Sequence, residues 1–190
     1  MLLGLNCGFA NEEIADLKPY EIVTGATPYI HRFRGKTETP DSVGIYAKWP
    51  LWDETYEHLQ SHMQKDGETA LLTPDGRRLI VGRADYVASV WRILQKNNLD
   101  TAGRKLSFKY LRKTAAKMIQ NDLGYGPHIA DAFLSHGGRG VLAKYTPQDW
   151  ERVAEAVGKL RTHLQGMFEA LDAHRSKELE AAIQAQRKTA

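Results

Sequence analysis

The chain has 190 residues, of which 42% are hydrophobic and 26% are charged. These values are typical of one globular domain with its own core, and they exclude a disordered or collagen-like chain. The single cysteine, Cys7, excludes a disulfide framework and a multi-cysteine zinc site, which favours a reducing, cytoplasmic location. Apolar stretches are only a few residues long and the N-terminus has no basic region, so we predict neither a membrane span nor a signal peptide.

The net charge of +3 is unevenly distributed along the chain. Residues 1–75 carry 6 basic and 12 acidic side chains, and residues 119–190 carry nine of each sign. Residues 76–118, in contrast, carry 11 basic side chains and only two acidic ones. Such a basic block is typical of a polyanion partner, because each Lys or Arg placed on a phosphate releases condensed counterions. A solvated charged face is the alternative interpretation.

The first predicted element is a helix over residues 1–17, where apolar residues recur at helical spacing. Gly8 interrupts this helix and Pro19 ends it. No cap residue precedes the apolar run, so we expect that an upstream part of the protein is missing. Residues 29–34 and 44–49 have the composition of two strands, and they are predicted to form a hairpin with Lys36 near its tip.

Helices are predicted over most of the remaining chain. Asp53 is expected to cap the next helix, and the apolar positions that start at Tyr86 indicate another. Ser107 is expected to cap a helix that reaches about residue 121, and a shorter helix is predicted over residues 127–134.

From Pro147 onward, one apolar stripe predicts a long helix, because its spacings alternate between three and four residues. The stripe consists of Trp150, Val153, Val157, Leu160, Leu164, Met167 and Leu171. We expect residues 1–172 to form one domain and residues 173–190 to be a tail that frays or reaches a partner protomer. Because strands are few, the predicted fold class is α+β, mainly α-helical with a small antiparallel β-sheet.

Several residues fit nucleophilic attack on a phosphodiester. Tyr145 is the candidate nucleophile, and a tyrosine in this role needs a neighbouring cation because its free pKa is about 10. The reaction also needs donors for the non-bridging oxygens, and the planar fork of arginine matches two oxygens at once. Arg112, Lys109 and His136 are the candidate donors.

These residues lie in motifs that resemble those of the tyrosine recombinases, or phage integrases. Leu-Ser-His at residues 134–136, with Tyr145 nine residues later, resembles the family's Leu-Gly-His and Tyr boxes, and Lys-Tyr-Leu-Arg at residues 109–112 resembles its His-x-x-Arg box. Lys-Thr at residues 36–37 is similar to the family's Lys-Thr element. Residues 7–14 resemble the Thr-Gly-Leu-Arg-x-x-Glu-Leu box. The four motifs occur in the family's order over nearly the whole chain, which makes the match fairly specific.

The resemblance implies the fold and chemistry of a recombinase catalytic domain that lacks the N-terminal core-binding domain. Tyr145 would attack the scissile phosphate to form a 3′-phosphotyrosyl link, and Lys36 would act as general acid toward the leaving 5′ oxygen. Arg112 would clamp the phosphate, His136 would hydrogen-bond to it, and Lys109 would replace the family's histidine. The released 5′ hydroxyl would later rejoin strands, in site-specific recombination or DNA integration.

The partners implied are double-stranded DNA and further copies of the chain assembled on it. No metal, nucleotide cofactor, membrane or small-molecule substrate is implied. Basic side chains, most of them in the central basic block, are predicted to contact the DNA: Arg77, Arg78, Arg104, Lys105, Lys113 and Arg139.

The first motif departs from the family at Ala10, where the family has one of the two arginines that clamp the phosphate. Losing one such donor typically lowers the rate by about 100-fold to 1000-fold. Arg32, Arg34 and Arg139 are candidates to replace it in space, and Glu13 matches the family's acidic residue. The alternative function is therefore a catalytically impaired DNA-binding or assembly module with a recombinase fold. A helical domain unrelated to nucleic acid is a third hypothesis.

Other candidate sites have simpler interpretations. His58 and His62 have metal-ligand spacing, but no third ligand is evident, so we expect surface histidines. Cys7 lies on an apolar helix and is expected to behave as a small hydrophobic residue. The glycine-rich residues 137–140 lack the lysine and hydroxyl of a phosphate-binding loop, and they are interpreted as a hinge.

Overall fold

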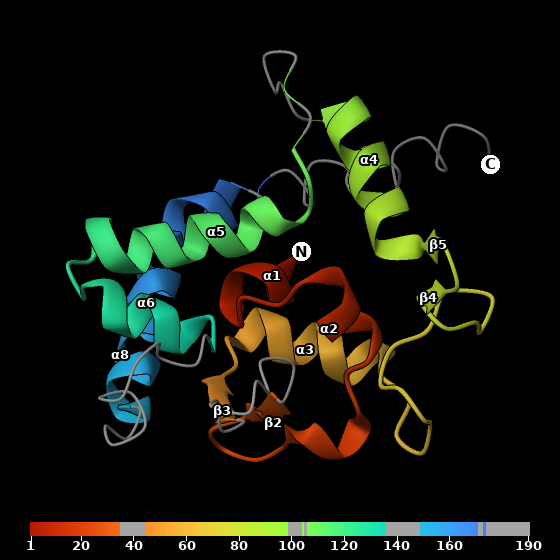
Figure 1. The fold of residues 1–190 in the computed structure, drawn as a ribbon, viewed down its shortest axis with the longest axis horizontal. Helices are drawn as coiled ribbons and strands as arrows, with labels where there is room; N and C mark the ends of the chain where they lie inside the picture. Colours follow the sequence, from red (N-terminus) through yellow and green to blue (C-terminus); the bar gives the residue numbers. More distant parts are fainter. Residues whose placement is uncertain (35–44, 99–103, 105, 136–148, 171–172, 174–190) are drawn as a thin grey trace, which may run out of the picture.

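Helices pack against one side of a small antiparallel sheet, which agrees with the predicted α+β class (Figure 1). The computed structural model describes residues 1–34, 45–98, 104, 106–135, 149–170 and 173. Five of the residues predicted to act on or bind DNA lie outside the described residues, namely Lys36, Lys105, His136, Arg139 and Tyr145. Among the described helices, none is both long enough and apolar enough to cross a bilayer.

The chain opens with two short helices, α1 (Leu2–Asn6) and α2 (Asn11–Ala15), which replace the single interrupted helix that was predicted. The break falls where Gly8 has a φ of +62°, a conformation that side chains rarely adopt. A Cβ atom on Gly8 would also lie 2.9 Å from the Phe133 ring. Both the backbone and the packing therefore require glycine at this position.

A three-stranded antiparallel sheet follows the short 3₁₀ turn η1 (Pro19–Glu21). Its order is β1 (Ile22–Val23), β2 (Tyr29–Arg34) and β3 (Ile45–Pro50). The predicted hairpin is confirmed, with its second strand one residue later than expected. β1 was not predicted, because two residues are too few to show an alternating pattern.

The inner face of this sheet belongs to the core, where Ile30 pairs with Trp49 and both are fully buried. Phe9 packs edge-on against Trp49, with ring centroids 5.1 Å apart. The outer face carries Phe33 opposite Tyr46, and both remain exposed.

The middle of the chain contains α3 (Asp53–His62), the two-stranded sheet β4 (Ile80–Val81) and β5 (Ala84–Asp85), and α4 (Tyr86–Asn98). The prediction that Asp53 caps α3 is wrong by one position. Trp52 precedes the helix as N-cap and makes no side-chain capping bond, so Asp53 is an acidic residue of the first turn.

The next helix is α5 (Lys109–Lys117), which continues as the π-helical segment η2 (Met118–Asp122). The prediction that Ser107 caps it is wrong, because Phe108 holds the N-cap position. Ser107 contributes only its backbone carbonyl, which accepts a hydrogen bond from the amide of Tyr110 at 2.9 Å.

Two further helices are α6 (Pro127–Phe133) and α8 (Trp150–His163). The apolar stripe of α8 is confirmed through Leu160, which is fully buried, and Leu164, which is 9% exposed, while Leu171 lies outside the described residues. A turn at residue 164 then changes the phase of the helical residues 165–170. As a result Phe168 is buried, whereas Met167, which the stripe predicted to be buried, is 47% exposed.

Tryptophan side chains join distant parts of the core through their indole N–H groups. Trp49 donates to the carbonyl of Phe133 at 2.8 Å, and Trp52 donates to the carbonyl of Val157 at 3.0 Å. Buried Asn6 joins α1 to the end of β3. Its amide donates to the Pro50 carbonyl, and its Oδ1 accepts from the backbone N–H of Trp52. These bonds tie α1, β3, α6 and α8 into one core.

The helix α4 and strands β4 and β5 lie on the opposite side of the molecule from α6 and α8 (Figure 1). Trp91 anchors α4, donating to the carbonyl of Leu106 at 2.8 Å and packing edge-on against Phe108. A second connection joins Asn11 at the start of α2 to Asp85, with Nδ2 and Oδ2 2.7 Å apart.

Candidate active site around Arg112

The guanidinium of Arg112 on α5 joins three segments that are far apart in the sequence. Nη1 donates to the carbonyl of Gly8 at 2.6 Å and to Oε2 of Glu13 at 3.1 Å. Nη2 donates to the carbonyl of Leu134 at 2.9 Å. The first of these partners is 104 residues away from Arg112 along the chain. Three of the four predicted motifs therefore meet at one side chain.

Packing of α5 against the core brings Arg112 to this position. Ala115 and Ala116, the next turn of α5, are buried, and Arg112 lies on the border of this face with 15% of its side chain exposed. Burial lowers the pKa of Arg112. An arginine nevertheless stays protonated in proteins, so the site holds a permanent positive charge.

Glu13 shapes the backbone next to this charge. Its Oε2 accepts a hydrogen bond from the N–H of Ala10 at 2.7 Å, which caps the start of α2, and the same atom pairs with Arg112. An acidic side chain that both caps a helix and orients an arginine fixes the local geometry. Glu13 thus stabilises the segment that carries Ala10.

Two residues with positive φ lie on either side of Arg112. Gly8 has a φ of +62° and Ser135 one of +49°, and Ser135 is the only such non-glycine residue in the described part of the chain. Both positions are those at which the recombinase motifs, to which the sequence was likened, would have glycine. Ser135 is buried, and its hydroxyl has no hydrogen-bond partner among the residues that the structure describes. The serine therefore occupies a conformation that glycine adopts without strain.

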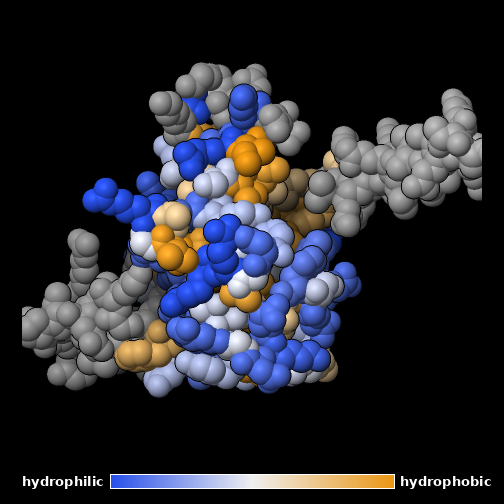
Figure 2. All heavy atoms as spheres, turned by 90° about the vertical axis from the view of Figure 1, so that its right-hand side faces the viewer, coloured by the Kyte–Doolittle hydropathy of each residue, from blue (hydrophilic) through white to orange (hydrophobic). Residues whose placement is uncertain are grey.

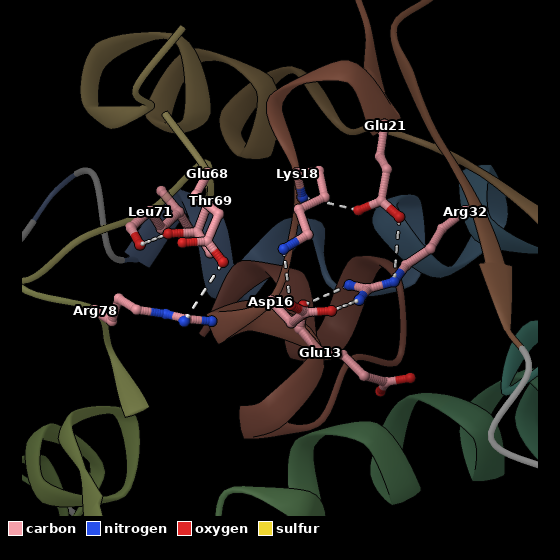
Figure 3. Close-up of polar contacts among 9 residues, drawn as sticks. All are labelled: Glu13, Asp16, Lys18, Glu21, Arg32, Glu68, Thr69, Leu71 and Arg78. Carbon is pink, nitrogen blue, oxygen red and sulfur yellow. Dashed lines mark hydrogen bonds and ion pairs between the residues drawn. The ribbon is translucent and has the colours of Figure 1, made fainter. Parts of the chain in front are cut away.

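Arg32 does not supply the arginine that is absent at position 10. Its guanidinium donates to the backbone carbonyl of Glu13 and pairs with Asp16, both at 2.7 Å, and Nε lies 3.4 Å from Glu21. Figure 3 shows the Glu13 side chain pointing away from this guanidinium, whereas Arg112 binds the Glu13 carboxylate. Arg32 is therefore part of a separate ionic cluster.

That cluster also affects the titration of Asp16. Partial burial acts to raise the pKa of Asp16, but hydrogen bonds and charges from Lys18 and Arg32 outweigh it, so the pKa is lowered overall. Lys18 approaches the carboxylate at 3.0 Å (Figure 3). The cluster thus holds a charged carboxylate at the end of α2.

The remaining described candidates lie on the surface, away from the Arg112 hydrogen bonds. Lys109 is exposed at the first position of α5, and Lys113 is exposed one turn later, 5.7 Å from the centre of the Tyr110 ring. Arg104 is also exposed. Lys109 therefore does not share the buried setting of Arg112.

Arg77 and Arg78 lie in the turn before β4, where Arg78 pairs with Glu68 (Figure 3). They share a hollow with Arg83 and Arg92, two arginines that sequence reasoning did not single out. The count of basic residues in the central block included them, but nothing in the sequence indicated that they lie together.

The histidines with metal-ligand spacing are exposed, as expected. The rings of His58 and His62 are 6.1 Å apart, and Nδ1 of His62 lies 2.9 Å from the carbonyl of His58. Over the residues that the structure describes, no group of three or more His, Cys, Asp or Glu side chains is arranged to hold a metal ion. Cys7 is fully buried, as predicted.

Comparison with known proteins adds no family to this geometry. No protein-family model, curated protein or solved structure matches the chain. The functional argument therefore rests on the residues gathered around Arg112 and on the basic surface.

Proposed function

We propose that this chain is a tyrosine recombinase-like catalytic domain that cleaves and rejoins DNA strands through a 3′-phosphotyrosyl link on Tyr145. The supporting observation is the convergence of Gly8, Glu13 and Leu134 on Arg112. The motifs were identified as separate short patterns in the sequence. Their meeting at the proposed phosphate-binding arginine is expected of a recombinase fold, whereas an unrelated helical domain gives no reason for it.

In the proposed reaction, Tyr145 loses its phenolic proton to solvent, its Oη attacks the phosphorus, and the bond from phosphorus to the 5′ oxygen breaks. Lys36 gives a proton to the leaving 5′ oxygen, while Arg112 and His136 stabilise the charge on the non-bridging oxygens. The energy of the phosphodiester is retained in the protein-DNA link. Attack by a 5′ hydroxyl on that link reverses the step and releases Tyr145.

A trapping experiment that offers the protein many DNA sequences at once tests this proposal. The protein is incubated with a pool of random-sequence duplexes, the reaction is denatured, and strands that remain attached to protein are isolated and sequenced. We expect attached strands that carry a label placed at their 5′ end, because a 3′-phosphotyrosyl link retains the upstream fragment. A label at the 3′ end should be lost.

Two variants make the experiment specific. Tyr145→Phe should abolish the covalent adduct and leave DNA affinity unchanged. Tyr110→Phe is the matched control, because Tyr110 is an exposed tyrosine on α5, and its adduct should persist. An adduct that survives in Tyr145→Phe, or one that retains the 3′ label, would contradict the proposed chemistry.

A catalytically impaired DNA-binding or assembly module is the second candidate function. The observation that favours it is Ala10, together with the engagement of Arg32 by Glu13, Asp16 and Glu21. In either function, residues 173–190 are proposed to contact a neighbouring protomer on DNA. Ala10→Arg should raise adduct formation if position 10 faces the phosphate. DNA binding without an adduct in both the wild-type protein and Ala10→Arg would support the second function.

A further inference from the structure

A hollow lined by four arginines lies where β4, β5 and α4 meet. Its volume is about 300 Å³. The arginines come from the turn before β4, the turn between β4 and β5, and the outer side of α4. They are Arg77, Arg78, Arg83 and Arg92.

Acidic side chains only partly compensate this charge. Asp75 pairs with Arg77 at 2.5 Å, and exposed Glu68 lies 3.5 Å from Arg78. Among the described residues, no acidic side chain lies within ion-pair distance of Arg83 or Arg92. The hollow therefore presents guanidinium groups that no carboxylate of the described residues neutralises.

The one carboxylate that lines the hollow, that of Asp85, is already bound by neutral donors. Its Oδ1 accepts from the N–H of Ala88 at 2.8 Å, and its Oδ2 accepts from Asn11 at 2.7 Å. It therefore serves to start α4 and to attach it to α2. It makes no ion pair with the arginines in the described structure.

Arg92 is held in place on α4 by its own helix. Its Nε donates to the Ala88 carbonyl at 3.3 Å, and its Nη2 donates to Oγ of Ser89 at 3.0 Å. Both hydrogen bonds use N–H groups on the same side of the guanidinium. Because both acceptors are neutral, the positive charge of Arg92 is not compensated and remains at the hollow. An ordered guanidinium loses less conformational entropy on binding an anion than a freely rotating one.

The same face also exposes apolar side chains. Val81 on β4 and Ile93 on α4 are each 59% exposed, and Tyr86 lies between them in the sequence with 39% exposed. Figure 2 shows hydrophobic and strongly hydrophilic side chains side by side on this face of the molecule. Exposed apolar side chains beside arginines can contact sugars and base methyl groups while the guanidinium groups bind phosphates.

We propose that this arginine-lined hollow binds the sugar-phosphate backbone of duplex DNA and provides most of the protein's DNA affinity. The proposal rests on the proposed function for the identity of the partner. A guanidinium fork matches the oxygens of a phosphate, and a concave basic surface fits the convex ridge of a DNA strand. A flat anionic membrane would instead favour protruding side chains. The affinity for DNA would thus come from α4 and the β4–β5 sheet, whereas the cleavage reaction would take place around Arg112.

The salt dependence of DNA binding tests this inference. Each phosphate contact contributes about 0.9 to the slope of log affinity against log salt concentration. The double variant R83Q/R92Q should therefore reduce that slope by about 1.8, so that the affinity ratio between about 50 and 200 mM salt shrinks by roughly 10-fold. The measurement is fluorescence anisotropy of a labelled short duplex of mixed sequence.

Matched variants exclude a general effect of charge or folding. R152Q/K159Q removes the same charge from exposed positions on α8 and should leave the slope close to that of the wild type. R83K/R92K keeps the charge and should restore most of the slope. All four arginines of the hollow are exposed, so these substitutions should leave the thermal unfolding midpoint unchanged.

The outcomes separate this inference from the proposed function. Equal slopes for R83Q/R92Q and R152Q/K159Q would overturn the DNA site. Binding of phosphatidylserine vesicles that depends on Arg83 and Arg92, with no duplex binding, would overturn it in favour of a membrane surface. Arginine-dependent duplex binding without any covalent adduct would support the hollow while contradicting the cleavage proposal alone.

Discussion

Two regions of this molecule use arginine in opposite ways. Around α1, α2 and α5, the guanidinium groups of Arg32 and Arg112 are largely buried and donate to backbone carbonyls and carboxylates. Around α4, Arg83 and Arg92 are exposed, and no acidic partner lies beside them in the described residues. The first pair holds chain segments together, whereas the second pair leaves its charge available to an external anion. Partly buried hydrogen bonds therefore give Arg32 and Arg112 a structural role, which Arg112 would combine with its proposed role at the phosphate, whereas Arg83 and Arg92 hold no buried segments together.

The largest difference between the regions should come from removing one arginine of each kind. Arg112→Met leaves the Gly8 and Leu134 carbonyls and the Glu13 carboxylate without this donor, and should lower the free energy of unfolding by about 3 kcal/mol. Arg92→Met, on the surface of α4, should change it by less than about 0.5 kcal/mol. Urea denaturation measures the free energy of unfolding of both variants. Similar losses of stability would contradict the distinction between buried and exposed arginines.

Glycines with nearly equal backbone angles give a second contrast. Gly8 and Gly82 have φ values of +62° and +58°, but only at Gly8 would a Cβ atom collide with a neighbour, the Phe133 ring. Gly82→Ala should lower the free energy of unfolding by about 1 kcal/mol through backbone strain alone. Gly8→Ala adds the collision and should lower it by about 3 kcal/mol. Thermal unfolding of both variants would separate strain from packing.

Serine-to-glycine substitutions should have opposite signs in the two regions. Ser135→Gly removes a strained φ of +49° and a buried hydroxyl without a partner in the described part of the chain, so we expect the free energy of unfolding to rise by about 1 kcal/mol. Ser89→Gly, within α4, should lower it by about 1 kcal/mol because glycine weakens a helix interior. A loss of stability in Ser135→Gly would show that its hydroxyl has a structural role.

The smallest effect should be a pH dependence. The pKa of Asp16 is lower in the folded chain than its ordinary value, so the stabilisation it provides is present above about pH 4 and is lost as the pH falls through the folded-state pKa. Asp16→Asn should therefore reduce stability at pH 7 by less than about 1 kcal/mol, since Asp16 is half exposed, and by a smaller amount at pH 2. Denaturation at both pH values measures it. Equal losses of stability at pH 7 and pH 2 would exclude an effect of the Asp16 charge.

Periodicity predicted the elements that are long enough to show it. The hairpin over β2 and β3, the helix α4 and the stripe of α8 follow from regular spacing of apolar residues. The strands β1, β4 and β5 have two residues each, so no period could reveal them. Helix ends were less predictable because caps depend on hydrogen bonds. Thus Trp52 and Phe108 occupy positions where Asp53 and Ser107 were expected.

The candidate site was predicted as a set of motifs but not as a geometry. Arg112 and Glu13 were both singled out from the sequence, yet nothing in it indicated that Arg112 also binds the carbonyls of Gly8 and Leu134. Such bonds involve backbone atoms, which every residue has, so no residue pattern marks them. In the same way, Arg83 and Arg92 become neighbours only when β4, β5 and α4 fold together.

The interior position of the first residues has a consequence for the order of folding. Residues 3–9 are all buried, and their contacts come partly from α3 and β3 and partly from α5 and the end of α6, more than a hundred residues later in the chain. During synthesis, the contacts with α3 and β3 can form early, but those with α5 and α6 can form only after most of the chain has emerged. Pairings over such separations form slowly, because the loop must close before contacts are gained. Until then part of the apolar surface of this segment stays exposed, and a chaperone can bind it while translation continues.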